Sequence, residues 1–395
     1  MIDKVLFMKS VKPARERTII IKVLWLCFAF LMLTLFSFGL SLGESFGQRS
    51  QNFTRTQDWN YTKSGKKIRI ELTYGGPKFL TPLLGVVKVD GKIIRKFKKY
   101  EDFKKKDKQD YPQLYSKFAD VKLLPARVKK SLQVLKKYDP LGYSIYQELK
   151  DKSGFEGHIQ SHEYYIDDVL PSAGGLIVAV HESLHNIDTL KAPFQYSHYY
   201  TINKSYIKVR RQNYLPQRNV IYDYLNKEDK KDSDLMTKAR TYLKGQSGTM
   251  PFEVFLDEVN AYTIGANTGY NLFTKKGTPY TSNKIYLEKN TFITEKVNPG
   301  IVHFMRFTTL YINHLKLKKR GAFNKLKRDK SYTAVVLQLW RQAETVLNKI
   351  CSSKLPLLDD IDKNTLHRTY SDKSMDSLKL LFYNKEEFTV PKNCR

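Results

Sequence analysis

An uncharged apolar segment near the N-terminus constrains this chain more than any other feature of its sequence. Residues 23–42 read VLWLCFAFLMLTLFSFGLSL and contain no charged side chain. As a helix that rises about 1.5 Å per residue, a segment of this length crosses the hydrocarbon core of a bilayer. The residues before it are rich in Lys and Arg, and such a flank stays in the cytoplasm. Residues 1–43 are therefore predicted to be a basic cytoplasmic leader plus a signal peptide or membrane anchor.

Two processed forms of this segment remain open. Small residues around Gly43 suit a signal peptidase, whose cleavage would release a secreted or periplasmic body. The apolar run is long for a cleaved signal, so an uncleaved anchor through residues 23–42 fits equally well. Both forms place the C-terminal body in the cell envelope, outside the cytoplasm.

The body that follows is strongly basic. The chain has 68 Lys and Arg against 39 Asp and Glu, a net charge of +29, of which residues 1–43 contribute only +4. A charge of this size attracts an anionic envelope polymer or lipid, although a compositional bias toward Lys without a dedicated partner explains it as well. The stretch Tyr196–Arg218 mixes aromatic and basic residues, which can bind single-stranded nucleic acid, line a peptide cleft or cover a core edge. Nucleic acid is not expected as a partner, because no nucleic-acid motif accompanies this stretch.

The pattern of the body predicts an α+β fold. Residues 44–65 are polar and predict a linker, and residues 66–152 predict a basic, β-containing region. Strands are expected within residues 67–96, where Asp90-Gly91 is a hairpin turn signal. The lysine-rich run Arg95–Asp110 indicates a solvated face or loop. A helix is expected over residues 125–152.

Residues 153–351 are predicted to form the main domain, and residues 352–395 a C-terminal tail. Helices are expected over residues 251–264, from Pro299 onward, and from about Tyr332 to Cys351. Lys227–Asp234 predicts a charged loop. Cys351 and Cys394 are the cysteines of the body, and they predict either a disulfide that ties the tail to the last helix or two reduced thiols.

The residues with the clearest chemistry are His181-Glu182-Ser183-Leu184-His185. Two His four places apart on a helix present their imidazoles on one face, a turn apart. No Pro interrupts residues 172–192, and the apolar residues Ile177, Val180, Leu184 and Ile187 recur at helical spacing. Zn²⁺ in a catalytic site takes three protein ligands, polarises a carbonyl and activates a water molecule. His181 and His185 are thus predicted zinc ligands, and Glu182 the general base that takes the proton of that water.

The segment Phe255-Leu256-Asp257-Glu258-Val259-Asn260-Ala261-Tyr262 supplies a third ligand by resemblance. A His-Glu-x-x-His helix followed by a later helix with Glu and, three places on, Ala resembles the gluzincin group of zinc metallopeptidases. The resemblance covers residues 174–264. It implies that Glu258, 73 residues after His185, is the third ligand, and that Ala261 lets the two helices approach. It also implies a zincin-like, mainly helical metallopeptidase domain that acts on a protein or peptide.

The chain departs from the group at Tyr262, where several members have an Asp that orients a zinc-binding His. Asp257, Asp188 or Asn260 are alternatives for that role, and Asp257 and Glu253 are rivals for the third ligand. Candidates for the group that stabilises the transition state are Tyr262, His198, Tyr199 and His303.

Two other interpretations compete with a zinc peptidase. The first is a membrane-tethered basic binding or structural protein with a structural or degenerate zinc site. The second is a module that binds an anionic polymer and holds no metal.

Overall fold

The computed structural model describes residues 55–75, 81–161, 169–191, 195–280, 299–353, 358 and 360–395. Residues 1–54, with the predicted leader and apolar segment, lie outside this part of the chain. Within the described part, no helix has the length and apolar character needed to cross a membrane. The chain forms two compact units that divide between Val121 and Lys122.

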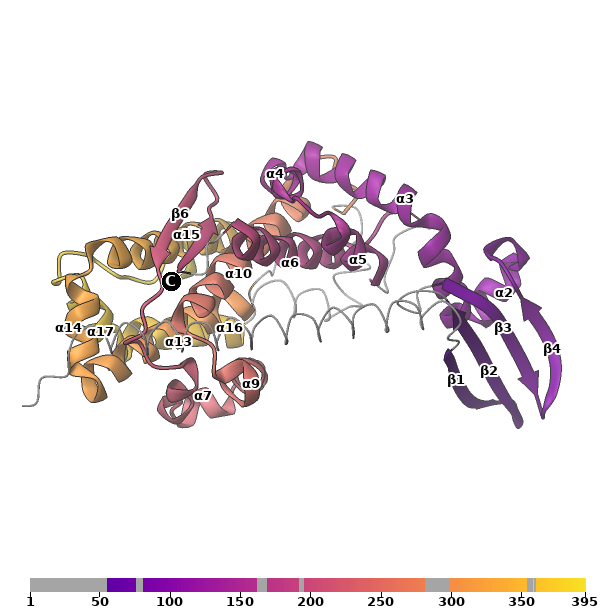
Figure 1. Cartoon of the computed structure of the whole chain (residues 1–395), viewed down its shortest axis with the longest axis horizontal. Coiled ribbons are helices and arrows are strands. Elements are labelled where there is room, and N and C mark those ends of the chain that lie inside the picture. The colour runs from indigo at the N-terminus through magenta and orange to yellow at the C-terminus, as the bar shows by residue number, and fades with distance from the viewer. Residues whose placement is uncertain are drawn as a thin grey trace, which may run out of the picture. The chain divides into compact units, whose positions relative to one another are not determined.

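The N-terminal unit contains a four-stranded antiparallel sheet in sequence order (Figure 1). Its strands are β1 (Arg55–Lys63), β2 (Lys66–Gly75), β3 (Thr81–Val89) and β4 (Lys92–Phe97). The predicted β structure is confirmed, and the turn residues Asp90 and Gly91 both have positive φ. The prediction of a linker at residues 44–65 is wrong for β1, which pairs with β2 along its whole length. A polar sequence forms this edge strand because the ladder bonds join backbone groups.

One face of this sheet is buried under the segment that follows it. The 3₁₀ helix η3 (Tyr100–Asp102), the helix α2 (Lys105–Asp110) and the first turns of α3 (Pro112–Tyr138) cover it. The run Arg95–Asp110 has exposed lysines, as predicted, but it also contributes the buried Phe103 and Asp107, and Arg95 Nη2 lies 2.6 Å from Asp107 Oδ2. The core of the unit is Ile70, Leu72, Val87, Phe97, Phe103, Leu114 and Phe118.

The predicted helix at residues 125–152 is two helices, and the first starts earlier. α3 begins at Pro112, and α4 (Pro140–Glu148) follows after Asp139. Pro140 has no N–H for a helical hydrogen bond, and the Asp139 carboxylate caps α4 by accepting from the Gly142 N–H at 3.2 Å. These two residues therefore end α3 and start α4. The division of the units lies inside α3, well before the expected domain boundary at residue 152. α4 belongs to the C-terminal unit because it packs against α6 (Ala173–Lys191).

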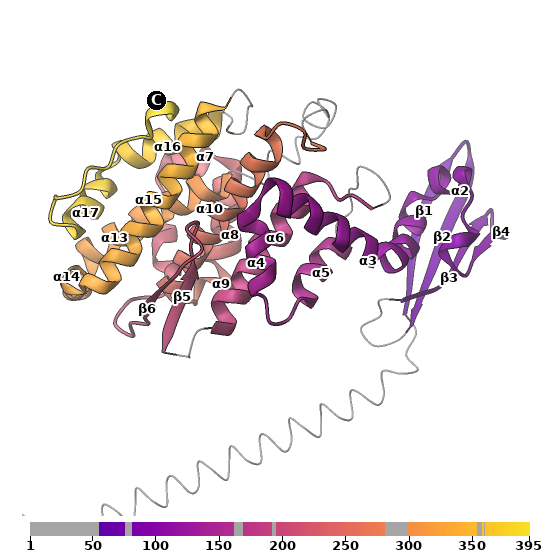
Figure 2. The ribbon, with the colours of Figure 1, turned by 90° about the horizontal axis from the view of Figure 1, so that it is seen from above.

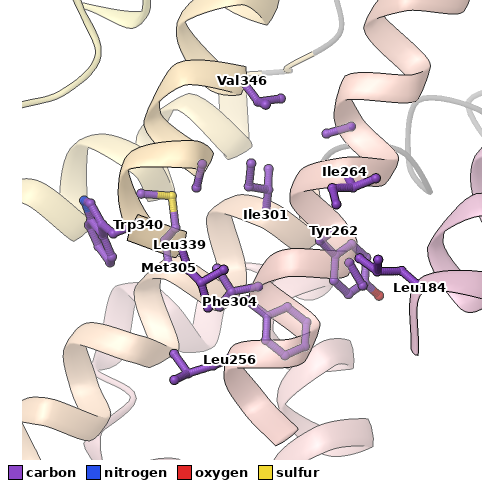
Figure 3. Close-up of a cluster of buried hydrophobic side chains, with 14 of the residues drawn as sticks. Leu184, Leu256, Tyr262, Ile264, Ile301, Phe304, Met305, Leu339, Trp340 and Val346 are labelled. Atoms are coloured by element: carbon purple, nitrogen blue, oxygen red, sulfur yellow. The ribbon is translucent and has the colours of Figure 1, made fainter. Parts of the chain in front are cut away.

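The C-terminal unit is built around the buried helix α10 (Phe252–Thr274). α10 lies between α6 on one side and α13 (Pro299–Lys318) and α15 (Lys330–Ser352) on the other (Figure 2). Side chains of α10, α13 and α15 interdigitate in the core that Figure 3 shows. The predicted helices in these three regions are confirmed: α13 starts at Pro299 as expected, α10 continues past its expected end, and α15 extends slightly beyond both of its expected ends. The remaining elements are α5 (Ser153–Ser161), β5 (Tyr196–Tyr200), β6 (Tyr206–Arg210), η4 (Arg218–Tyr224), α7 (Lys227–Lys231), α8 (Ser233–Leu243), α9 (Gly245–Gly248), α14 (Arg320–Arg328), α16 (Asp360–Ser371), α17 (Lys373–Leu381) and η5 (Lys392–Cys394).

The predicted charged loop at Lys227–Asp234 is instead helical and partly buried. α7 and the start of α8 occupy it, and Asp229 is fully buried. Arg306 Nη2 lies 2.8 Å from Asp229 Oδ2, and Arg368 Nε lies 2.9 Å from Asp229 Oδ1. The prediction failed because both arginines are distant in sequence, so nothing local marks the aspartate as buried.

The C-terminal residues are part of the same compact unit. α16 and α17 pack against α13, and Cys394 forms a disulfide with Cys351 at the end of α15. Of the two states left open by the sequence, the structure contains the disulfide. Taken together, the described chain is mostly helical with small antiparallel sheets, which confirms the α+β class.

Candidate metal centre

The motif helix forms as its apolar spacing predicts. In α6 the residues Ile177, Val180, Leu184 and Ile187 are all at most 3% exposed, so this side of the helix faces the core. His181 and His185 lie beside that stripe, one turn apart. Their Nε2 atoms point at the same place and are 3.2 Å apart.

Glu258 reaches this place from α10. Its Oε2 lies 3.5 Å from His185 Nε2 and 3.9 Å from His181 Nε2. The helices come close at Gly265, where a Cβ would already contact Ile177 and His181. Ala261, the small residue expected at the approach, is fully buried. Glu258 Oε2 is buried without a hydrogen-bond partner, a costly state for a carboxylate oxygen unless it binds a cation.

The distances between the three donor atoms suit Zn²⁺. Ligand atoms held tetrahedrally at about 2.0–2.1 Å from a zinc ion are about 3.3 Å apart. The observed separations are 3.2, 3.5 and 3.9 Å. Among the described residues, His181, His185 and Glu258 form a cluster whose ligand atoms lie close enough together to hold a metal ion.

No protein-family model, curated protein or solved structure matches this chain.

Asp257 contacts the imidazole of His185 at the nitrogen that does not face the other ligands. Its Oδ2 lies 2.7 Å from Nδ1 of His185, so Asp257 is an outer partner of this ring, not a rival ligand. Burial and the charge of Asp257 raise the pKa of Asp188 well above its usual value. Asp188 Oδ1 in turn accepts from the Tyr200 N–H at 2.9 Å.

The remaining alternatives have other partners. Asn260 donates from Nδ2 to the Tyr200 carbonyl at 2.9 Å, and Glu253 accepts from the Gln212 N–H at 2.9 Å. Neither is therefore engaged with the two imidazoles.

The two imidazoles differ in their preferred proton state. Burial and nearby positive groups lower the pKa of His181 well below its usual value, and its ring hydrogen-bonds to the backbone of Ala261. Its imidazole therefore favours the neutral form, which is the form that binds a metal ion. Burial opposes protonation of His185 too, but the carboxylates of Asp257 and Glu258 outweigh it and raise its pKa. His185 must therefore lose a proton when a cation binds, which makes metal affinity depend on pH.

A pocket of about 210 Å³ opens beside His181. Glu182 lines it from the next position of α6, where the predicted general base should be. The other lining residues are Ile177, Val178, Lys238, Tyr262 and Gly265.

Tyr262 is the transition-state candidate that the fold brings to the centre. Its ring packs edge-on against His181 with centroids 4.5 Å apart and stacks on Phe304 at 5.1 Å. On the α13 side, Gly300 lies against the same ring so closely that even a Cβ would overlap it. Burial raises the pKa of Tyr262 far above its usual value, so its hydroxyl keeps its proton.

The other three candidates have different surroundings and do not line the pocket. His303 is fully buried with Nε2 3.7 Å from Asp232 Oδ2. His198 is on β5 opposite Lys208, and Tyr199 donates to the Glu253 carbonyl at 3.0 Å.

Lys238 of α8 is the pocket residue that sequence reasoning missed. In a chain so rich in lysine, one more lysine on a short helix has no spacing that marks it.

Proposed function

We propose that the protein is a zinc-dependent peptidase of the cell envelope, with a zincin-like catalytic unit that acts on a protein or peptide. The observation that carries the proposal is the convergence of three donor atoms on one point. Those atoms are Nε2 of His181, Nε2 of His185 and Oε2 of Glu258. Glu182 lines the adjoining pocket, so a base stands next to the place where a substrate can enter.

The positions of the side chains support the following catalytic roles. Zn²⁺ held by the three donors supplies a Lewis acid that polarises the scissile carbonyl and lowers the pKa of water. Glu182 accepts a proton from the attacking water and passes it to the leaving amine. Tyr262 donates a hydrogen bond to the oxyanion that develops on the substrate, and its buried, protonated hydroxyl suits this role.

The location is part of the same proposal. The uncharged residues 23–42 deliver the C-terminal body across the membrane, as an anchor or as a cleaved signal. The positive charge of the body favours anionic lipid or envelope polymer near its substrate, and nucleic acid is not expected there.

Metal analysis of the purified full-length chain tests the centre. The wild type should contain about one zinc per chain, as three converging ligands of this type predict. His181→Ala and His185→Ala should lose it, whereas His367→Ala, at an exposed position of α16, should keep it. A His181→Ala variant with wild-type zinc content would contradict the assignment.

Cleavage of an unbiased peptide library, read by mass spectrometry, tests the reaction. Glu182→Gln should keep its zinc but lose activity by about 100-fold or more, because a positioned base contributes about that much. Glu228→Gln, on the exposed side of α7, is the matched control. A zinc-containing wild type that cleaves nothing would favour the alternative, a tethered basic binding or structural protein with a structural or degenerate zinc site.

A further inference from the structure

Lys238 places a positive charge at the pocket beside the metal centre. It is half-buried on α8 and lines the pocket together with His181 and Glu182. Its Nζ donates to the Tyr262 hydroxyl and lies 4.6 Å from the centre of that ring. The ring of Tyr242 is also close, with 5.9 Å between Nζ and its centroid. These contacts keep the ammonium at the pocket wall instead of in bulk solvent.

The two phenols beside Lys238 carry no charge of their own. Burial raises the pKa of Tyr242 to about 12 and raises that of Tyr262 further, so both hydroxyls keep their protons. A second cation lies near the same ring, since Arg218 Cζ is 5.7 Å from the centroid of Tyr242. Arg218 is only 1% exposed, and its Nη1 is buried without a hydrogen-bond partner. Two positive groups therefore lie close to one aromatic ring.

The size and the apolar lining of the pocket bear on what it can hold. Pockets for drug-sized ligands measure about 300–1,000 Å³, and this one is smaller at about 210 Å³. A volume of this size suits one side chain or one chain end. Ile177, Val178 and Gly265 form an apolar wall against which the carbon atoms of such a group can pack.

We propose that this pocket is a substrate subsite that takes a carboxylate, with Lys238 as its counter-ion. The carboxylate is either an acidic side chain or the C-terminus of a peptide, and the apolar wall packs against the carbon atoms that carry it. The consequence for cleavage rests on the proposed peptidase function, whereas binding of the carboxylate does not.

Binding is measured with the full-length chain carrying Glu182→Gln, so that no peptide is consumed. Two pairs of probes distinguish the sources of the carboxylate: acetyl-Ala-Asp-Ala-amide against acetyl-Ala-Asn-Ala-amide, and acetyl-Ala-Ala-Ala with a free against an amidated C-terminus. In at least one pair the acid should bind about tenfold more tightly than its amide, as expected for a charge-assisted hydrogen bond. Lys238→Met should remove this preference, and Lys238→Arg should retain most of it. Lys244→Met, which removes an exposed ammonium just beyond α8, should leave it unchanged.

Two binding results would overturn the proposal. In the first, neither acid is preferred by the protein with Lys238. In the second, Lys238→Met weakens acid and amide equally, or Lys238→Arg loses the preference as fully as Lys238→Met does.

Kinetics with the otherwise wild-type chain separate this proposal from the peptidase assignment. Lys238→Met should raise KM for the preferred acid peptides about tenfold and leave kcat nearly unchanged. An equal loss of kcat on acid and amide peptides would mean that Lys238 acts on the developing oxyanion, and the subsite proposal would be wrong. If the wild type cleaves no peptide, the peptidase assignment fails, while the binding preference still decides the subsite.

Discussion

Asp257 lies 2.7 Å from Nδ1 of His185, on the edge of the imidazole opposite the one that faces the three-donor centre. Its neighbour in the chain, Glu258, contacts the other edge of the same ring. The two neighbouring carboxylates of α10 thus have different roles. Asp257 orients the ring, and Glu258 is positioned as a metal ligand. Such a carboxylate–histidine pair fixes the tautomer and makes the ligand nitrogen more basic.

Replacing Asp257 tests this division. Asp257→Asn should lower zinc affinity by about 10- to 100-fold, because the amide supports the ring without its charge. Competition with a chromophoric chelator measures the change. Asp376→Asn, at an exposed position of α17, should leave zinc affinity as it is. An unchanged affinity in Asp257→Asn would mean that this contact does not tune the ligand.

Gly300 in the first turn of α13 controls the position of Tyr262. A Cβ at this glycine would overlap Cδ1 and Cε1 of the tyrosine ring. Although Ala is the better helix former, Gly300→Ala should destabilise the fold by about 1–3 kcal/mol and displace the ring from His181. Chemical unfolding measures the first effect and peptide cleavage the second.

Gly321→Ala is the matched control for this variant. Nothing lies within 4 Å of a Cβ at that helical position. It should be neutral or stabilising by up to about 1 kcal/mol. Equal free energies of unfolding for the two alanine variants would contradict the packing argument.

Asp232 should make stability depend on pH in the acid range. Burial alone would raise its pKa, but the nearby imidazole of His303 and hydrogen bonds from the Leu235 N–H and the Thr365 hydroxyl lower it to about 2. The unfolded value is about 3.9, so the folded state favours the carboxylate. Its contribution, about 2–3 kcal/mol, is present above pH ~4 and is lost as the pH falls toward 2.

Urea unfolding of wild type and Asp232→Asn at pH 7 and at pH 2.5 checks this sign. The variant should be less stable at pH 7, and the difference should shrink at the lower pH. Asp234→Asn, the exposed neighbour, should show no such convergence. A difference that stays constant would mean that folding does not shift the pKa, and one that grows in acid would mean that the shift has the opposite sign; either result contradicts the prediction.

The Cys351–Cys394 disulfide closes a loop with a sequence separation of 43. Loop-closure entropy for such a loop predicts that the bond stabilises the folded chain by about 4 kcal/mol. The double variant Cys351→Ser with Cys394→Ser should lose about this much in chemical unfolding. Reductant should destabilise the wild type by a similar amount and leave the double variant unaffected. A wild type that is indifferent to reductant would contradict the expected contribution.

Local patterns predicted those elements whose determinants are close in sequence. The apolar residues of α6, α13 and α15 recur at helical spacing, and Asp90-Gly91 carries its own turn geometry, so these elements are recognisable without tertiary information. Predictions failed where partners are distant. β1 looks like a linker until β2 pairs with it, and Asp229 looks solvated until Arg306 and Arg368 reach it.

The sequence by itself determined that His181 and His185 share one face of a helix, because a spacing of four residues matches the helical turn in any fold. It also determined that Glu182 follows the first of them. Only the tertiary structure decided that Glu258 faces both imidazoles, whereas Asp257 contacts Nδ1 of His185. It also decided that Lys238 lines the pocket. Consecutive residues of a helix point in directions about 100° apart, so the packing of α10 against α6 selects which carboxylate reaches the centre.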